Sequence, residues 1–438
     1  MGLDMVGRRL AAAAAVVGAL VLAAPAPARA ANVCDSVPAA APTSKAEPYE
    51  DQLYDPERLA TLATGAGIRV AVIDSGVDAT HPQLRGHVLA GRDVLHGDAT
   101  GRQDCVGHGT AVAGIIAAQP QRGVGMQGLA PGVQIVPVRV SEQEKIDGKT
   151  QGDAGSPAKF AQAIEWAADP AGGRAQVINL SLVMIVDDPA VRGAVADAID
   201  RGVTVVAAAG NDAAQGNPRP YPASYPGVIG VGAVGPDGQR SSFSQHGDYV
   251  DLAAAGDQLT VAARTAGQTT GQGTSYAAPF VAATAALILQ RFGPQSPAQV
   301  ARRLVATADP APGGGRSDEY GYGLLNPYRA VTETLGPEKP PAAAPMVVHP
   351  EDPVAVALQE RRARAERISM VAAAVGGGVV ALVGMTAIVL RRGRRRDWRP
   401  ASPDESDRDD SGPDSPEPRP DNTWPNNAGP DIGTYGRA

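Results

Sequence analysis

The hydrophobic pattern of the chain alternates between two periods over residues 61–335. Short, almost wholly apolar runs rich in Val and Ile are typical of strands buried on both faces. They cover residues 68–73, 134–140, 177–181, 203–208 and 228–234. Longer stretches of helical periodicity lie around them, at residues 110–118, 157–168, 189–200, 274–292 and 296–307. This alternation predicts a three-layer α/β domain with a mostly parallel central sheet.

Two further apolar segments lie outside this domain and bear on topology. Residues 10–24 follow Arg8 and Arg9 and precede a small-residue cleavage pattern at residues 28–30. This arrangement predicts a secretory signal peptide over residues 1–30, with an uncleaved anchor as the alternative. Residues 369–390 carry no charged side chain and are long enough to span a bilayer, although a buried core helix is the alternative.

Arginines beside residues 369–390 favour a transmembrane helix. Five arginines follow within residues 391–396, and such clusters lie on the cytoplasmic side of a membrane. Four arginines within residues 361–367 precede the segment and weaken this asymmetry. Together with the signal peptide, the pattern predicts a single-pass protein of the cell membrane, with its bulk extracytoplasmic and a cytoplasmic tail at residues 391–438.

Composition assigns the remaining segments. Residues 336–368 are rich in Pro and Ala, which predicts an extended linker. Residues 391–438 hold much Pro, Asp, Ser and Gly and too little apolar surface to fold alone, so we predict a disordered tail. Residues 31–60 form an N-terminal extension ahead of the domain. The net charge of −7 argues against a nucleic-acid partner for the chain as a whole.

Four polar residues with glycine neighbours lie at the ends of predicted elements, where α/β sheets form their sites. Asp74 and Asn211 follow strands, and His108 and Ser275 open helices. Singly, each has an ordinary role as a turn residue, a helix cap or a buried histidine. Together they match the needs of nucleophilic acyl transfer: a nucleophile, a base, a residue that orients the base and an oxyanion donor.

Three motifs resemble the active-site motifs of subtilisin-like serine proteases. They are Asp74-Ser75-Gly76, His108-Gly109-Thr110 and the segment Gly273-Thr274-Ser275-Tyr276-Ala277-Ala278-Pro279, in the chain order of that family. The resemblance implies a serine endopeptidase acting on protein substrates without a cofactor, with Asp74, His108 and Ser275 catalytic and Asn211 in the oxyanion hole. It also implies two substrate-binding walls, formed by Ser181, Leu182 and Val183 and by Ala208, Ala209 and Gly210.

Val183 departs from the family pattern, because many subtilases carry glycine at this position. A side chain there limits the approach of a peptide backbone and favours narrow specificity or low activity. Residues 141–156 form a predicted polar insertion near the cleft without a dense carboxylate cluster, so we expect no metal site. We interpret the remaining histidines as structural or surface residues: His81, His87, His96, His246 and His349.

The predicted order of segments resembles the mycosins, membrane-anchored subtilases associated with type VII secretion systems. The resemblance implies an extension at residues 31–60 that stays attached and wraps the catalytic domain. It also implies the membrane complex of such a system as a partner. Two hypotheses follow: a narrow-specificity endopeptidase that processes exported substrates, and a structural stabiliser of the membrane complex that acts independently of proteolysis.

Cys34 and Cys105 are the two cysteines of the chain. Disulfides are the default state for paired cysteines in exported proteins, so we predict that they form one, with two unpaired thiols as the alternative. The bridge would tie the extension to a position three residues before His108. It would close a loop of about 70 residues and stabilise the fold by on the order of 4 kcal/mol in the chain-entropy model.

Overall fold

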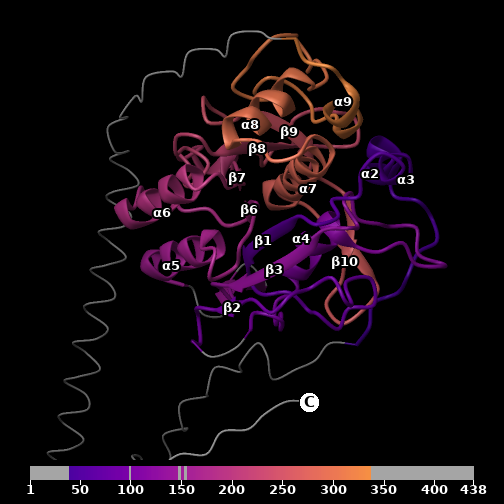
Figure 1. Ribbon diagram of the computed structural model, residues 1–438, viewed down its shortest axis with the longest axis vertical. Helices are drawn as coiled ribbons and strands as arrows, with labels where there is room; N and C mark the ends of the chain where they lie inside the picture. Colours follow the sequence, from indigo (N-terminus) through magenta and orange to yellow (C-terminus); the bar gives the residue numbers. More distant parts are fainter. Residues whose placement is uncertain (1–38, 98–99, 147–148, 152–154, 337–438) are drawn as a thin grey trace, which may run out of the picture. The chain divides into compact units, whose positions relative to one another are not determined.

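Seven parallel strands form the central sheet of the computed structural model, which describes residues 39–97, 100–146, 149–151 and 155–336 (Figure 1). The strand order is β2-β3-β1-β6-β7-β8-β9. The strands are β1 Arg69–Asp74, β2 Arg92–Asp93, β3 Gln134–Arg139, β6 Val177–Leu180, β7 Thr204–Ala208, β8 Ile229–Val234 and β9 Leu252–Ala255. The predicted parallel sheet is therefore confirmed, with β2 and β9 added at its two edges.

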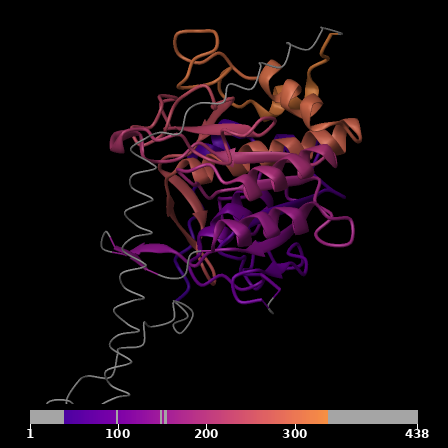
Figure 2. The ribbon, with the colours of Figure 1, turned by 90° about the vertical axis from the view of Figure 1, so that its left-hand side faces the viewer.

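Helices cover both faces of this sheet, as Figures 1 and 2 show. Strand residues alternate between the two covers: Val70 and Val72 of β1 pack into one hydrophobic cluster, and Ala71 and Ile73 pack into the other. The first cluster holds α4 (His108–Ala117) and α7 (Thr274–Phe292), and the second holds α5 (Pro157–Ala168) and α6 (Pro189–Asp200). Burial on both faces explains why the strand segments are apolar throughout.

Helix ends follow local capping chemistry. Pro stands at the first position of α5, α6 and α8 (Pro297–Ala306), directly after a Ser or Asp cap. Ser296 forms a full capping box with Gln299. Ser296 is therefore the N-cap that precedes α8, whereas the prediction placed it within the helix. Helix α4 begins at His108, two residues earlier than predicted, because Ser75 and Asp104 accept hydrogen bonds from Gly109 N and Thr110 N of its first turn.

The switch in strand order lies at β1. It pairs with β3 on one side and with β6 on the other. The chain leads from β1 to β2 and β3 on one side and then crosses to β6 on the other, where the strand order continues in the opposite direction. Ligand sites in α/β sheets form outside the carboxyl end of such a point. Asp74 ends β1 and Ser181 follows β6, so the topology brings two predicted site residues to one edge.

The N-terminal extension contacts the domain along its described part, residues 39–60. Ala41 donates its N–H to Ala266 O at 2.9 Å, and Gln268 donates to Pro42 O at 3.0 Å. These bonds attach the extension to the turn of the hairpin formed by β10 (Leu259–Ala262) and β11 (Gln268–Gly271). Gly267 has a φ of +82°, and a methyl group on its Cα would lie 2.0 Å from Ala41 O, so only glycine fits beneath this crossing.

Short elements complete the described chain and were not predicted. They are α2 (Tyr49–Tyr54), α3 (Pro56–Ala60), α9 (Pro327–Thr332), the 3₁₀ turn Ala213–Gln215, and the hairpin of β4 (Glu144–Ile146) and β5 (Lys149–Gln151). The hairpin lies within the predicted insertion 141–156. Among the described residues, no helix combines the length and apolarity needed to cross a bilayer. The predicted signal peptide, linker beyond residue 336, transmembrane helix, tail, Cys34 and His349 lie outside the described residues.

Candidate active site

Asp74 and His108 meet at the carboxyl end of β1. Asp74 is 1% exposed, and its Oδ1 lies 2.8 Å from His108 Nδ1. Because an ionised carboxylate is only an acceptor, His108 donates from Nδ1 and keeps an acceptor lone pair on Nε2. Ser75 N also donates to Asp74 Oδ1, at 2.7 Å. The carboxylate therefore fixes both the tautomer and the direction of the imidazole ring.

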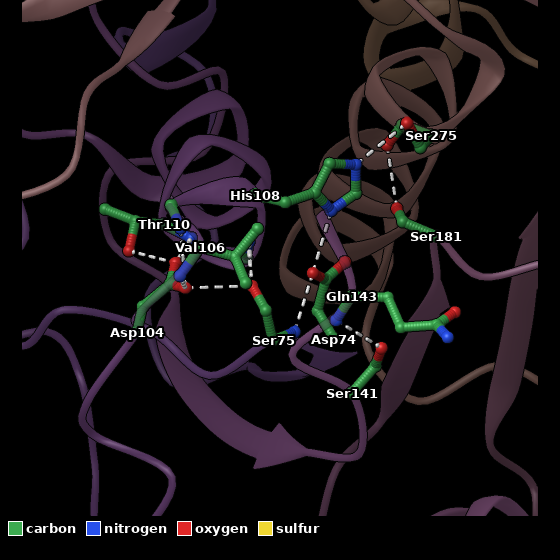
Figure 3. Close-up of polar contacts among 12 residues, drawn as sticks. Asp74, Ser75, Asp104, Val106, His108, Thr110, Ser141, Gln143, Ser181 and Ser275 are labelled. Carbon is green, nitrogen blue, oxygen red and sulfur yellow. Dashed lines mark hydrogen bonds and ion pairs between the residues drawn. The ribbon is translucent and has the colours of Figure 1, made fainter. Parts of the chain in front are cut away.

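Ser275 completes a hydrogen-bonded chain with these two side chains (Figure 3). Its Oγ lies 3.0 Å from His108 Nε2, and the hydroxyl donates to that nitrogen. The serine is the second residue of α7, which begins directly after Gly273. Its hydroxyl therefore lies at the positive end of a 19-residue helix dipole, where developing negative charge is favoured.

A proline four residues after Ser275 leaves the carbonyl group of this serine available. Pro279 lies inside α7 and has no N–H to donate to Ser275 O in the helix ladder. Ser181 Oγ donates to that carbonyl instead, at 2.7 Å. This bond attaches the end of β6 to the first turn of α7, beside the reactive hydroxyl.

The Asn211 amide is oriented by the helix that carries Ser275. Its Oδ1 accepts from Thr274 N at 2.9 Å and from Thr274 Oγ1 at 3.0 Å. The Nδ2 donor is then directed to the space over Gly273, where an added Cβ would lie 3.2 Å from Nδ2 and 3.1 Å from Ser275 Oγ. The amide donor and the serine hydroxyl thus border one small space, in which an oxyanion can form.

Two walls enclose a pocket of about 230 Å³ beside Ser275. Ser181, Leu182 and Val183 line one side, and Ala208 and Gly210 line the other. Predicted wall residue Ala209 is fully buried instead and packs against Tyr249 and Val250, so its side chain does not line the pocket. The further lining residues, which the sequence interpretation missed, are Ile185, Asp212, Gln245 and Thr274.

A second groove, of about 460 Å³, lies beside His108 and is lined by Val106, Tyr276 and Arg264 among others. Ala39 and Ala41 of the N-terminal extension also line it. The extension therefore forms part of the wall of a groove that reaches the triad. Nothing in the composition of residues 39–41 signals this role, because backbone pairing with the β10–β11 turn determines it.

Three of the histidines outside the motifs have a local partner for a ring nitrogen, whereas His246 Nδ1 is buried without a hydrogen-bond partner among the described residues. His81 is 1% exposed, with Nε2 at 3.4 Å from Gly267 O. His96 Nε2 lies 3.2 Å from Glu142 Oε1, and His87 Nδ1 lies 3.3 Å from Val133 O. Within the described ranges, no three His, Cys, Asp or Glu side chains gather closely enough to hold a metal ion.

The electrostatic setting favours a charged imidazole. Burial alone lowers the pKa of His108, but the charge of Asp74, the hydrogen bond to it and the charge of Asp104 together raise that pKa above its ordinary value. Asp104 was not predicted as a site residue. Its signal in the sequence is a carboxylate three residues before Gly107, the residue that precedes α4.

The subtilase family model matches residues 65–323. Subtilisin E of Bacillus subtilis is 38% identical over 267 residues, which cover 60% of this chain and 65%, just under two thirds, of that protein. Mycosin-1 of Mycobacterium tuberculosis is 34% identical over 382 residues, which cover 76% of this chain and 83% of mycosin-1.

Solved structures give the same relationship. MycP1 from Mycobacterium smegmatis aligns with a TM-score of 0.60 and 29% identity, over 71% of this chain and 92% of that chain. The MycP3 protease from the type VII (ESX-3) secretion system aligns with a TM-score of 0.55 and 30% identity, over 68% of this chain and 90% of that chain. The chain belongs to the subtilase family of serine peptidases and is a homologue of the mycosins.

Proposed function

We propose that this protein is a serine endopeptidase of narrow specificity that is anchored in the cell membrane and acts outside it on exported substrates of a type VII secretion system. One observation carries the catalytic part: the continuous hydrogen-bonded chain from Asp74 through His108 to Ser275, with distances of 2.8 and 3.0 Å. The mycosin relatives support the association with secretion.

The geometry supports acyl transfer in two steps. Ser275 Oγ attacks the scissile carbonyl carbon while its proton passes to His108 Nε2, and Asp74 stabilises the resulting imidazolium. Asn211 Nδ2 and the N-terminal end of α7 stabilise the oxyanion. His108 then gives the proton to the leaving amine, the C–N bond breaks, and an acyl-enzyme remains. Water, deprotonated by His108, attacks the ester and regenerates Ser275.

Narrow specificity rests on the shape of the substrate walls. Val183 lines the 230 Å³ pocket beside Ser275. It also lines a separate pocket of about 180 Å³, together with Leu182 and Met184. Val183 is 36% exposed, so its side chain is accessible to a peptide bound in either pocket. The extension narrows the other side of His108 through Ala39 and Ala41. Both features limit which peptides reach the serine.

Ser275→Ala in cells tests this function directly. We expect the variant chain to accumulate normally, because the substitution removes one hydroxyl, while processing of the exported substrate stops. The readout is the size of secreted proteins by mass spectrometry, compared with parent cells. Continued processing in cells whose sole copy is Ser275→Ala would rule out Ser275 as the nucleophile.

A structural role in the membrane complex is the second candidate. One relative, MycP1, is described as an essential component of the type VII (ESX-1) secretion system, which favours a function beyond cleavage. Deleting the whole chain distinguishes the two. If total secretion persists with Ser275→Ala but stops on deletion, the chain supports the complex independently of proteolysis.

A further inference from the structure

Asp104 is a buried carboxylate beneath the first turn of α4, and the triad mechanism gives it no role. It is 3% exposed. Its Oδ1 accepts from Ser75 Oγ at 2.9 Å, from Gly107 N at 2.7 Å and from Val106 N at 3.1 Å. Its Oδ2 accepts from Thr110 N at 2.8 Å and from Thr110 Oγ1 at 2.6 Å. Figure 3 shows Asp104 with Ser75, Val106 and Thr110 beside Asp74 and His108.

The five donors identify Asp104 as ionised. Both carboxylate oxygens accept from backbone N–H groups, which leaves no oxygen suited to a proton. Each of the two hydroxyls also accepts one backbone bond, Ser75 Oγ from Gly109 N at 3.0 Å and Thr110 Oγ1 from Asp78 N at 2.9 Å, and its O–H can be donated to Asp104. Burial and the charge of Asp74 raise the pKa of Asp104 above its ordinary value, and the hydrogen bonds from Thr110 and Gly107 oppose that rise.

Asp104 connects the two halves of the catalytic pair. On one side it binds Ser75, whose N–H donates to the same Asp74 oxygen that His108 contacts. On the other side it caps the first turn of α4, in which His108 is the first residue and Gly107 supplies no capping side chain. A shift of either segment would change the distance between Asp74 and His108.

Other charged or titratable groups near His108 have separate roles. Asp74 contacts its Nδ1, and the Tyr276 ring of α7 lies 5.0 Å from the imidazole centroid. Burial raises the pKa of Tyr276 further above its ordinary value, so this phenol is neutral. Arg264 lines the groove beside His108, and its guanidinium donates to Cys105 O. Asp104 is therefore the second negative charge that acts on the ring.

We propose that Asp104 is a positioning residue of the catalytic centre: it locks the α4 N-terminus to the Asp74–Ser75 turn and adds a negative charge that stabilises protonated His108. This inference rests on the proposed peptidase function. Asp104 would thus hold Asp74 and His108 at hydrogen-bonding distance and also contribute to the proton affinity of His108.

The test is the rate at which a fluorophosphonate probe labels Ser275 in the full-length chain, measured from pH 5 to 9. In the parent chain this rate rises as His108 loses its proton. Asp104→Asn removes the charge and sets an amide donor against backbone N–H groups. We expect the labelling rate on its high-pH plateau to fall roughly tenfold. The pH at which the rate is half of the plateau, called the inflection, should move to lower pH by on the order of one unit.

Two further variants separate positioning from general stability. Ser75→Ala keeps the charge but breaks the link to Asp74, so the plateau should fall while the inflection stays in place. Asp251→Asn is the matched control: this carboxylate accepts from Gly230 N, and burial raises its pKa to about 6, but it makes no contact with the triad. It should leave the inflection unchanged.

Each outcome decides the inference. A parental inflection in folded Asp104→Asn would reduce Asp104 to a structural cap and overturn it. If Asp104→Asn does not fold, parental rates in Ser75→Ala at every pH would overturn the positioning role by themselves. Absence of labelling in the parent chain would remove the peptidase function as well, so the two failures are distinguishable.

Discussion

At the scale of single residues, the site depends on backbone groups as much as on the triad side chains. The Ser275 carbonyl is available because Pro279 has no N–H, and Ser181 donates to it, which attaches the end of β6 to α7. The Asn211 amide is oriented by Thr274, the residue before the proposed nucleophile. Each of these bonds places a proposed site residue relative to Ser275 Oγ, so small displacements of α7 would misalign them together.

Asn211→Ala should lower kcat by about 10²–10³ with little change in KM, because the amide acts on charge that develops in the transition state. That magnitude is the established one for the corresponding loss in a subtilisin, and we expect it to apply here. Steady-state kinetics on an identified peptide substrate measure it. Asp197→Ala, on the exposed face of α6, is the control and should retain the parental kcat. A rise in KM alone for Asn211→Ala would contradict the oxyanion assignment.

Val183→Gly should broaden specificity. Removing the side chain opens the wall between two pockets to larger substrate groups, and one missing group in such a pocket changes discrimination by roughly 10–200-fold. A peptide library, profiled by mass spectrometry before and after the substitution, measures the gain, and Val183→Ala should be intermediate. An unchanged profile in the glycine variant would mean that Val183 does not limit access.

The positions of the four candidate site residues could be predicted from sequence, because their motifs occur together at element ends, although each is ordinary when taken singly. Asp74, His108, Asn211 and Ser275 all lie where their motifs indicated. Ala209 illustrates the limit. Its neighbours line the pocket, but its side chain points to Tyr249 and Val250, and a three-residue motif does not reveal which side chain faces inward. Asp104 shows a second limit, since its partners come from distant segments.

At the scale of elements, α2 has an unusual attachment to the domain. Glu50 and Asp51 are both 3% exposed. Glu50 Oε1 accepts from Thr260 N of β10 at 2.7 Å, and Asp51 Oδ2 accepts from Gln127 N at 2.9 Å. Burial raises the pKa of Glu50 to about 7 and that of Asp51 to about 8. The docked helix therefore favours protonated carboxyls.

The sign of the resulting pH dependence follows from proton linkage. Both pKa values are higher in the docked state than their ordinary values of 4.5 and 3.8, so docking takes up protons. The stabilisation is complete below about pH 4 and is lost as pH rises through about 7 and 8. We expect the double variant Glu50→Gln, Asp51→Asn to match the parent Tm at pH 4 and to exceed it at pH 9.

Thermal unfolding at several pH values measures this difference, and Glu165→Gln serves as the control, because Glu165 is exposed on α5, away from α2. A difference in Tm between parent and double variant that stays constant with pH would contradict proton uptake by Glu50 and Asp51. The neutral side chains keep similar shape and acceptor oxygens, so a loss of packing is not the expected effect.

The elements themselves differ in how far sequence predicts them. Strands β1, β3, β6, β7 and β8 lie within one residue of their predicted limits because both faces are buried and their apolar runs are continuous. The extension helices α2 and α3 were missed, since they have six and five residues and are stabilised by docking, not by their own periodicity. Strand β9, with the sequence Leu-Ala-Ala-Ala, has too little β propensity to stand out.

At the scale of the whole molecule, the predicted disulfide would join the extension to the loop that precedes His108. Cys105 is 1% exposed, and Arg139 Nη2 lies 3.4 Å from its Sγ. Cys34 lies outside the described residues, so the pairing remains a prediction. If it forms, the extension, the groove wall at Ala39 and Ala41 and the loop before α4 are connected within a short stretch of chain.

Cys105→Ser should then lower the free energy of unfolding by on the order of 4 kcal/mol. Cys34→Ser and the double variant should lower it by the same amount, because one bond is lost in each case. Urea unfolding of the oxidised chain measures the three values. Additive losses in the double variant, or no loss in Cys34→Ser, would show that the two cysteines do not pair.

The most direct test of the central claim is active-site labelling of the purified full-length chain with a fluorophosphonate probe at pH 8. We expect a single labelled residue, Ser275, which peptide mapping would identify. We also expect no labelling in Ser275→Ala and a large loss in His108→Ala, because the hydroxyl needs its base. Labelling that persists in Ser275→Ala, or that is unaffected by His108→Ala, would contradict an assembled Asp74–His108–Ser275 centre.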